Sequence, residues 1–145
     1  MKQGKVRPIS IGILCRGNSI LVHRGYDKVK QQTFYRPLGG KIEFGETAAQ
    51  ALAREFLEEI GQEVINARYL LTFENLFVFN GQPGHEIVLI FQAEFANPAA
   101  YEASFFPLVE DDGSMWQAVW KDLSEFSPET PLYPDGLLEY LVNHS

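Results

Sequence analysis

One segment, residues 47–61, constrains the fold most strongly, because its sequence predicts a helix with both ends marked. Thr47 and, three residues later, Gln50 form a capping-box pattern, in which each side chain accepts a hydrogen bond from the other residue's backbone N–H. Good helix formers fill the interval up to Gly61, a residue type that commonly ends helices. We therefore expect one sharply bounded helix in this part of the chain.

The predicted helix has two faces of different chemistry. At 100° per residue its apolar side chains form one continuous face, which we expect to pack on a sheet. These side chains are Leu52, Ala53, Phe56, Leu57 and Ile60. Glu55, Glu58 and Glu59 lie on another face at spacings of three and four residues, where like charges repel. Grouped carboxylates suit Mg²⁺ or Mn²⁺, but the spacing alone leaves a solvated acidic face as the alternative.

The rest of the chain predicts strands and turns around this helix. Apolar alternation at residues 9–15, a turn at 16–19 and a second strand at 20–26 predict a hairpin, which a polar loop at 26–32 follows. Beyond the helix, the expected elements are long strands at 64–79 and 86–95 joined by a turn at 80–84, a short strand at 116–120, and a closing helix at 137–142. Because strands and helices do not alternate strictly, we expect an α/β (α+β) fold with a mixed β-sheet between helices.

The residues before the helix help to choose between a metal site and a solvated face. From Gly40 to Gln62 the sequence resembles the signature of the Nudix hydrolase family, and we call this stretch the box. The matching fixed positions are Gly40, Glu46, Arg54, Glu55, Phe56, Glu58, Glu59 and Gly61. One departure is Gln62, where the family usually has an aliphatic residue, and Val64 is expected to supply that contact instead. Another is Leu38, which separates Pro37 from the glycine pair.

The resemblance implies a role for each polar residue of the box. Glu55, Glu58 and Glu59 are expected to be the catalytic and metal-binding carboxylates for Mg²⁺, with Mn²⁺ as a substitute, joined by the carbonyl of Gly40. Glu46 and Arg54 are expected to form a structural ion pair. Glu58 is the first candidate for the general base. The alternatives outside the box are Glu74, Glu86, Glu102 and Glu110.

The resemblance also implies a reaction class. We expect a hydrolase that cleaves a pyrophosphate bond in a nucleoside diphosphate linked to another moiety, by magnesium-assisted attack of water on phosphorus. The alternative is a Nudix-fold module that binds a nucleotide and regulates a partner without turnover. Retention of all three helix carboxylates favours the enzyme.

Substrate contacts are harder to assign from sequence. Arg24, Arg36 and Lys41 lie near the expected site and are candidates for binding phosphate oxygens, with ordinary surface charge as the alternative. Tyr35 or Phe34 is a candidate for stacking on a base, with core packing as the alternative. All of these remain open at the level of sequence.

Composition limits the partners and the setting. A length of 145 residues predicts a single domain, residues 1–145. A net charge of −7 argues against binding to a nucleic-acid polymer but not against a small nucleotide that binds with a cation. The sequence has one cysteine, Cys15, which we expect to be buried; an intrachain disulfide is therefore impossible and a cytoplasmic setting is favoured.

Three further expectations concern burial, the membrane and assembly. Trp116 and Trp120 lie on the expected short strand and are expected in the core. The sequence holds no apolar stretch near the ~20 residues of a membrane-spanning helix, so no membrane association is expected. The resemblance to a family with many dimeric members suggests a homodimer, with a monomer as the alternative.

Overall fold

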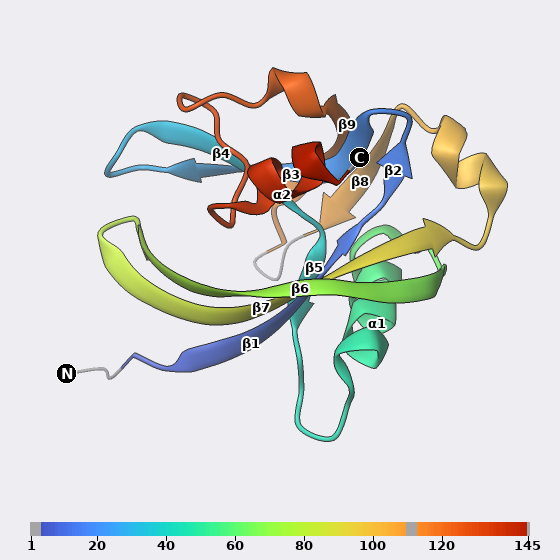
Figure 1. Cartoon of the computed structure of the whole chain (residues 1–145), viewed down its shortest axis with the longest axis horizontal. Helices are drawn as coiled ribbons and strands as arrows, with labels where there is room; N and C mark the ends of the chain where they lie inside the picture. Colours follow the sequence, from blue (N-terminus) through green and yellow to red (C-terminus); the bar gives the residue numbers. More distant parts are fainter. Residues whose placement is uncertain (1–3, 110–112, 145) are drawn as a thin grey trace.

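The computed structural model describes residues 4–109 and 113–144, so Glu110 lies outside the described residues. Within them, the strands form a four-stranded and a five-stranded sheet (Figure 1). The four-stranded sheet has the order β5 (Gly39–Lys41), β1 (Val6–Ile13), β7 (Gln82–Phe95) and β6 (Val64–Phe79). The other sheet has the order β2 (Cys15–Arg16), β3 (Ser19–Asp27), β9 (Met115–Asp122) and β8 (Phe105–Val109), with β4 (Gln32–Pro37) also paired to β3.

Helical segments complete the α+β fold that the sequence predicts. The longest is α1 (Ala48–Ile60), and α2 (Leu137–Asn143) lies near the C-terminus. Short 3₁₀ turns, η1 (Pro98–Glu102) and η2 (Leu123–Glu125), follow β7 and β9. The described part of the chain contains no helix that is both long and apolar enough to cross a membrane.

The first sheet is mixed, as expected, because β1 lies between a parallel and an antiparallel neighbour. Ile9 pairs with Val88 of β7 in the parallel direction and with Lys41 of β5 in the antiparallel direction. The last five residues of β1 are all buried, which is typical of a strand covered on both faces. The predicted hairpin between residues 9–15 and 20–26 is therefore wrong for most of its length, since β1 does not pair with β3.

The chain changes sheets at Leu14, and this explains the error. Leu14 is fully buried, and its carbonyl accepts a hydrogen bond from the N–H of Leu21 (3.1 Å). Of the segment between Leu14 and the turn, Cys15 and Arg16 pair with β3. The turn at residues 17–18 was correctly predicted, but it joins β3 to two residues rather than to the whole preceding strand.

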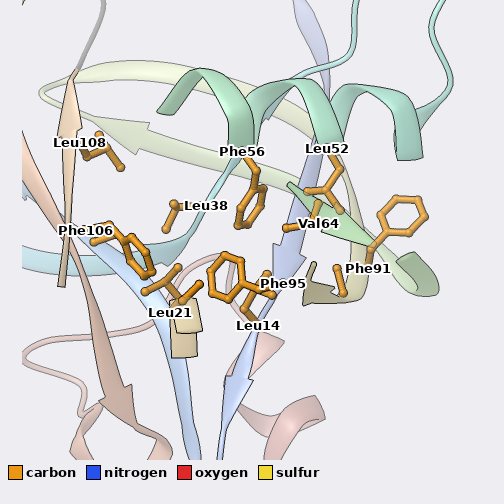
Figure 2. Packing of buried hydrophobic residues seen from close by; sticks show 13 residues of the cluster. Leu14, Leu21, Leu38, Leu52, Phe56, Val64, Phe91, Phe95, Phe106 and Leu108 are labelled. Atoms are coloured by element: carbon orange, nitrogen blue, oxygen red, sulfur yellow. The ribbon is translucent and has the colours of Figure 1, made fainter. Parts of the chain in front are cut away.

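The core lies on both sides of the first sheet. One cluster joins α1 to the sheets, with Leu52 and Phe56 directed from the helix towards Leu14, Leu38 and Phe95 (Figure 2). A second cluster contains residues of β1, β3 and β7 together with Leu132 and Leu137 of the C-terminal region. The sheet therefore has α1 against one apolar cluster and α2 against the other.

The buried face of α1 is rotated from the predicted one, since Ala51, Leu52 and Phe56 are buried and Ala53 is only partly so. Leu57 is 53% exposed, whereas Ala51 is fully buried, so the expectation that Leu57 packs on the sheet is wrong. The helix contacts β5 as well as β1, and Gly40 of β5 lies against Glu55 of the helix. The helical periodicity of the sequence predicts the width of the apolar face. The contact with β5 determines how the helix is rotated about its own axis, and therefore which side chains are buried.

The second long hairpin agrees closely with the prediction. β6 has the predicted bounds, but β7 begins four residues earlier than expected, so the turn contains only Asn80 and Gly81. Both turn residues have positive φ, 51° and 78°, as a two-residue hairpin turn requires. Likewise, the predicted loop at 26–32 is shorter, because β3 extends to Asp27. β8 was not predicted at all.

Candidate active site

The helix that carries the box glutamates is capped at both ends as predicted. The Thr47 hydroxyl accepts from the Gln50 N–H (3.1 Å), and the Gln50 side chain accepts from the Thr47 N–H (2.8 Å). At the other end, Gly61 has φ 69° and its N–H donates to the Leu57 carbonyl (3.0 Å). These caps fix which residues of the box face the preceding loop.

Arg54 connects the acidic residues of the box. Its guanidinium donates to both carboxylate oxygens of Glu46 (2.6 and 3.1 Å), to Glu55 (2.9 Å) and to Glu58 (3.3 Å). It also donates to the Lys41 carbonyl (2.9 Å), which joins α1 to β5. These hydrogen bonds lower the pKa of Glu46 and raise that of Arg54 above its already high ordinary value. Arg54 therefore offsets the repulsion among these carboxylates.

Gly40 lies directly against the carboxylate of Glu55. A methyl group built on Gly40 would overlap that carboxylate, so a side chain at this position would displace it. The absence of a side chain thus allows the backbone of β5 to approach the acidic face of α1. Gly45, with φ 91°, lets the loop turn back so that Glu46 reaches the Glu43 N–H (3.0 Å).

The box glutamates suit a divalent cation by their chemistry, although they are not gathered as a ligand set. Within residues 4–109 and 113–144, no three His, Cys, Asp or Glu side chains converge on one point. Glu55 and Glu58 instead bind Arg54, and Glu58 is 60% exposed and free to reorient. Carboxylate oxygens beside the Gly40 backbone are the donors that Mg²⁺ prefers. Binding would require Glu58 to turn away from Arg54.

A large cleft opens between the β3–β4 and β6–β7 hairpins, which extend to the same side of the molecule (Figure 1). Its volume is about 1040 Å³. Its basic lining residues are Arg7, Arg24, Lys28, Lys30 and Arg36. Its aromatic lining residues are Tyr26, Phe34, Phe77, Phe79, Trp116 and Tyr133. A concave surface that is both cationic and aromatic in a chain of net charge −7 suits an anion that carries a ring.

A smaller hollow of about 150 Å³, here called the neck, lies beside this cleft and reaches Gly40 of the box. His23 and Arg36 line both the cleft and the neck, and Gly39 and Gly40 line the neck. The pKa of His23 is lowered to about 4 by burial and by the positive charge of Arg36. At neutral pH the neck therefore presents an uncharged imidazole beside a cationic guanidinium.

Glu86 is a buried carboxylate in the lining of the cleft. Its Oε1 accepts a hydrogen bond from Arg36 (3.1 Å), and its Oε2 accepts one from Arg7 (3.5 Å). The contact joins β4 of one sheet to β1 and β7 of the other.

The tips of the two hairpins are tied together at the outer end of the cleft. Buried Asp27 accepts from the N–H groups of Val29 (3.0 Å) and Lys30 (2.9 Å) in its own turn, and from that of Asn80 (3.2 Å) in the opposite turn. In return, the Asn80 side chain accepts from the Lys28 N–H (2.7 Å). The cleft walls are thus fixed to each other at this end.

We expect Asp27 to make the stability of the fold sensitive to acid. Its pKa lies below the ordinary value of 3.8, chiefly because the Lys30 N–H donates to it, so folding favours the ionised form. Its contribution is complete above pH 3.8 and is lost as the pH falls through the lowered pKa. In thermal melts, Asp27→Asn should reduce the melting temperature at neutral pH and lose less on acidification from pH 5 to about pH 2. Parallel curves for the two proteins would contradict this role.

The structure brings only some of the predicted substrate contacts together. Arg24, Arg36 and Phe34 line the cleft. Tyr35 points elsewhere, since its ring packs on Phe126 (5.9 Å between centroids) and lies outside the lining of the cleft and the neck. Lys41 also lies outside both.

Sequence reasoning missed several lining residues. Trp116, expected in the core, is 39% exposed and lines the cleft, so that expectation is wrong. His23 was not considered, yet it pairs with Arg36 across the β3–β4 ladder and so faces the same side. Cys15, expected to be buried, is exposed on the two-residue strand β2. The strand pattern could have identified His23. Because every second residue of a strand lies on the same face, residues 23, 25 and 27 share one face of β3.

Comparison with known proteins gives the family. A family model described as NUDIX domain matches residues 6–138. The NAD-capped RNA hydrolase NudC of Pseudomonas aeruginosa is 27% identical over 124 residues, which cover 86% of this chain and 39% of that protein. The chain therefore spans about two-fifths of the length of the curated relatives it matches.

Solved structures share the fold. A MutT NUDIX hydrolase from Burkholderia pseudomallei has a TM-score of 0.66 at 20% identity, covering 96% of this chain and 97% of that one. A NUDIX hydrolase from Nitrosomonas europaea has a TM-score of 0.65 at 15% identity, covering 96% and 87%. These likenesses show the fold, and the family model, which takes in the box and both sheets, shows that the chain belongs to the Nudix hydrolase family.

Proposed function

We propose that this chain is a magnesium-dependent hydrolase of a pyrophosphate bond in a nucleoside diphosphate linked to another moiety. The observation that supports the proposal is the placement of the cationic, aromatic cleft beside the neck, which is lined by Gly40, a residue in contact with Glu55. A substrate with its ring in the cleft would extend its phosphates through the neck towards the box.

The box residues divide the chemical work in this proposal. Glu55, Glu58 and Glu59 would hold Mg²⁺ together with the Gly40 carbonyl. The bound ion would neutralise phosphate charge and lower the pKa of a water. Arg54 would hold Glu46 and Glu55 in place, as its hydrogen bonds to both indicate.

Glu58 remains our first candidate for the base that accepts the water proton. Its side chain is exposed, and the hydrogen bond from Arg54 is the longest that Arg54 makes to the box glutamates (3.3 Å), so Glu58 can reorient towards a substrate. The alternative bases have other partners or lie elsewhere. Glu74 pairs with His85 (3.3 Å), and Glu86 binds two arginines. Glu102 is the last residue of η1 and is exposed. None of these three touches the box in the contacts described.

The name of a relative guides which second moieties to test. The related NudC protein is named for an NAD cap, which supports testing dinucleotides alongside nucleoside triphosphates, ADP-ribose and nucleotide sugars. We propose a small nucleotide rather than a nucleic-acid polymer, because five of the twelve basic side chains line one cleft while the chain as a whole is acidic. A cytoplasmic setting and the choice between monomer and homodimer stay predictions from sequence.

A magnesium-dependent hydrolysis screen of these substrate classes tests the proposal. We expect one class to be turned over well and the reaction to stop when EDTA removes the metal. If the protein binds nucleotides in the cleft yet hydrolyses none of them, the regulatory module becomes the better interpretation.

We expect ligand binding to change the fluorescence of Trp116. Trp116 lines the cleft, whereas Trp120 stacks on Tyr101 away from it, so only the former should report on a ring entering the cleft. Titration of the wild type with ADP should quench emission in a saturable way, and Trp116→Phe should abolish most of that change. Equal quenching in Trp116→Phe would place the ligand elsewhere.

A further inference from the structure

We propose that Glu86 is a positioning residue that holds the guanidinium of Arg36 in the neck, where it binds a phosphate of the substrate. This inference rests on the proposed function, because it assigns a role within the same site. Arg7 would be held by the second oxygen of the same carboxylate, at the cleft side.

The position of Glu86 is unusual for a carboxylate. On β7 it shares a face with Val88 and Ile90, which are fully buried, and Glu86 itself is only 3% exposed. Apolar side chains of similar volume at such a place are often at least as stabilising as a buried ion pair. The carboxylate is therefore not explained by stability alone.

The geometry gives the carboxylate a directional effect on Arg36. Arg36 uses Nη2 to bind Glu86 at 3.1 Å, and a guanidinium has five N–H donors in one rigid plane. Fixing one edge of that plane fixes the direction of the remaining donors. Arg36 lines both the cleft and the neck, so its guanidinium lies between the aromatic lining of the cleft and Gly40.

The local charge also suits an anion. Arg7 and Arg36 share the single negative charge of Glu86, and His23, across the ladder from Arg36, is uncharged at neutral pH. One positive charge is left over, and it is held in place rather than mobile. A preorganised cation of this kind binds phosphate better than a flexible one, because less side-chain freedom is lost on binding.

The same contacts argue against Glu86 as the general base. Each of its oxygens already accepts a hydrogen bond from an arginine. Accepting a proton from water would leave two guanidinium groups facing a neutral acid in a buried place, which is costly. A base and a positioning residue also give different kinetics, since loss of a base lowers kcat and loss of a phosphate contact made in the ground state raises KM.

The test is a double-mutant cycle with Glu86→Gln, Arg36→Ala and the double variant. Binding of ADP is measured by calorimetry in EDTA, and KM and kcat are measured in magnesium with the substrate found in the screen. We expect Glu86→Gln to weaken ADP binding by about 10-fold and to raise KM similarly, with kcat within about 3-fold of the wild type. In the Arg36→Ala background, Glu86→Gln should have no further effect on binding, because it acts through Arg36.

Matched variants keep the result interpretable. Arg68→Ala removes an arginine on β6 that binds Gln92 (2.6 Å) outside the cleft, and ADP binding should be unchanged. If Glu86→Gln does not fold, Arg36→Lys keeps the charge without the planar donors, and it should weaken ADP binding nearly as much as Arg36→Ala.

Several results would overturn the inference. The first is that the wild-type protein does not bind ADP, and the second is that Glu86→Gln weakens ADP binding equally with and without Arg36. The others are that Glu86→Gln lowers kcat at constant KM, or that it lowers the melting temperature and leaves ADP binding unchanged. Failure of the proposed function would give a different set of results. The wild type would bind ADP without metal and the variants would show the expected changes in ADP binding, but the wild type would hydrolyse no substrate in magnesium.

Discussion

Replacing Glu59 by glutamine is expected to lower kcat at least ~10²-fold in magnesium, with little change in the melting temperature. Glutamine preserves the size of the side chain but removes the negative charge that the proposed metal site requires. Glu59 lies one turn beyond Glu55 on the same face of α1, and Glu55 is in contact with Gly40. The measurement is steady-state hydrolysis of the best substrate from the screen across a range of magnesium concentrations.

Glu63→Gln provides the matched control for this change. Glu63 is an exposed glutamate just beyond the end of α1. Its backbone carbonyl, which the change leaves in place, accepts a hydrogen bond from the Ala96 N–H (3.0 Å). The control should retain wild-type turnover. Near-normal kcat in Glu59→Gln at every magnesium concentration would remove Glu59 from the proposed metal site.

The second large effect is expected on stability, from Arg54→Ala. This change removes the hydrogen bonds that join Glu46, Glu55 and Glu58 and leaves their charges close together without a counter-ion. For a partly buried network the melting temperature should fall by several degrees, on the order of 5 °C, at neutral pH. Calorimetric melts at low salt measure the loss, since screening would reduce the repulsion.

Magnesium should restore part of that loss. A cation bound by the folded box stabilises it in proportion to its occupancy, and this effect should be larger in Arg54→Ala than in wild type because Arg54 no longer competes for Glu55 and Glu58. Arg68→Ala again serves as the control. A large loss of activity at an unchanged melting temperature would show instead that Arg54 acts directly in the reaction.

The elements with local signals were predicted well. The helix ends at Thr47 and Gly61 follow from side chains that satisfy backbone groups within one turn, so no distant residue is needed to place them. The long hairpin of β6 and β7 was predicted for the same reason, since its turn chemistry is local. The partners of β1 were not, because pairing with β7 depends on residues almost eighty positions away.

The site divides in the same way. The box is contiguous in the sequence, and its resemblance to a family signature identified the polar residues in register. The cleft is not contiguous, because its walls are two hairpins about fifty residues apart that meet only through contacts such as Asp27 with Asn80. One feature of the sequence did point to the cleft. Glu86 is the only charged residue in the segment from Glu86 to Phe91, at a position where the strand pattern predicts an apolar side chain.

The placement of β1 has a consequence for how the chain folds during synthesis. Its parallel partner is the segment from His85 to Gln92, so the centre of the first sheet cannot close until the ribosome has passed that segment. Until then the buried apolar side chains of β1 lack one neighbour, although α1 has already emerged. Such long-range pairing slows folding and prolongs the exposure of an aggregation-prone strand to solvent. An amino-terminal fusion partner that shields β1 should therefore raise the soluble yield more than one attached at the other end.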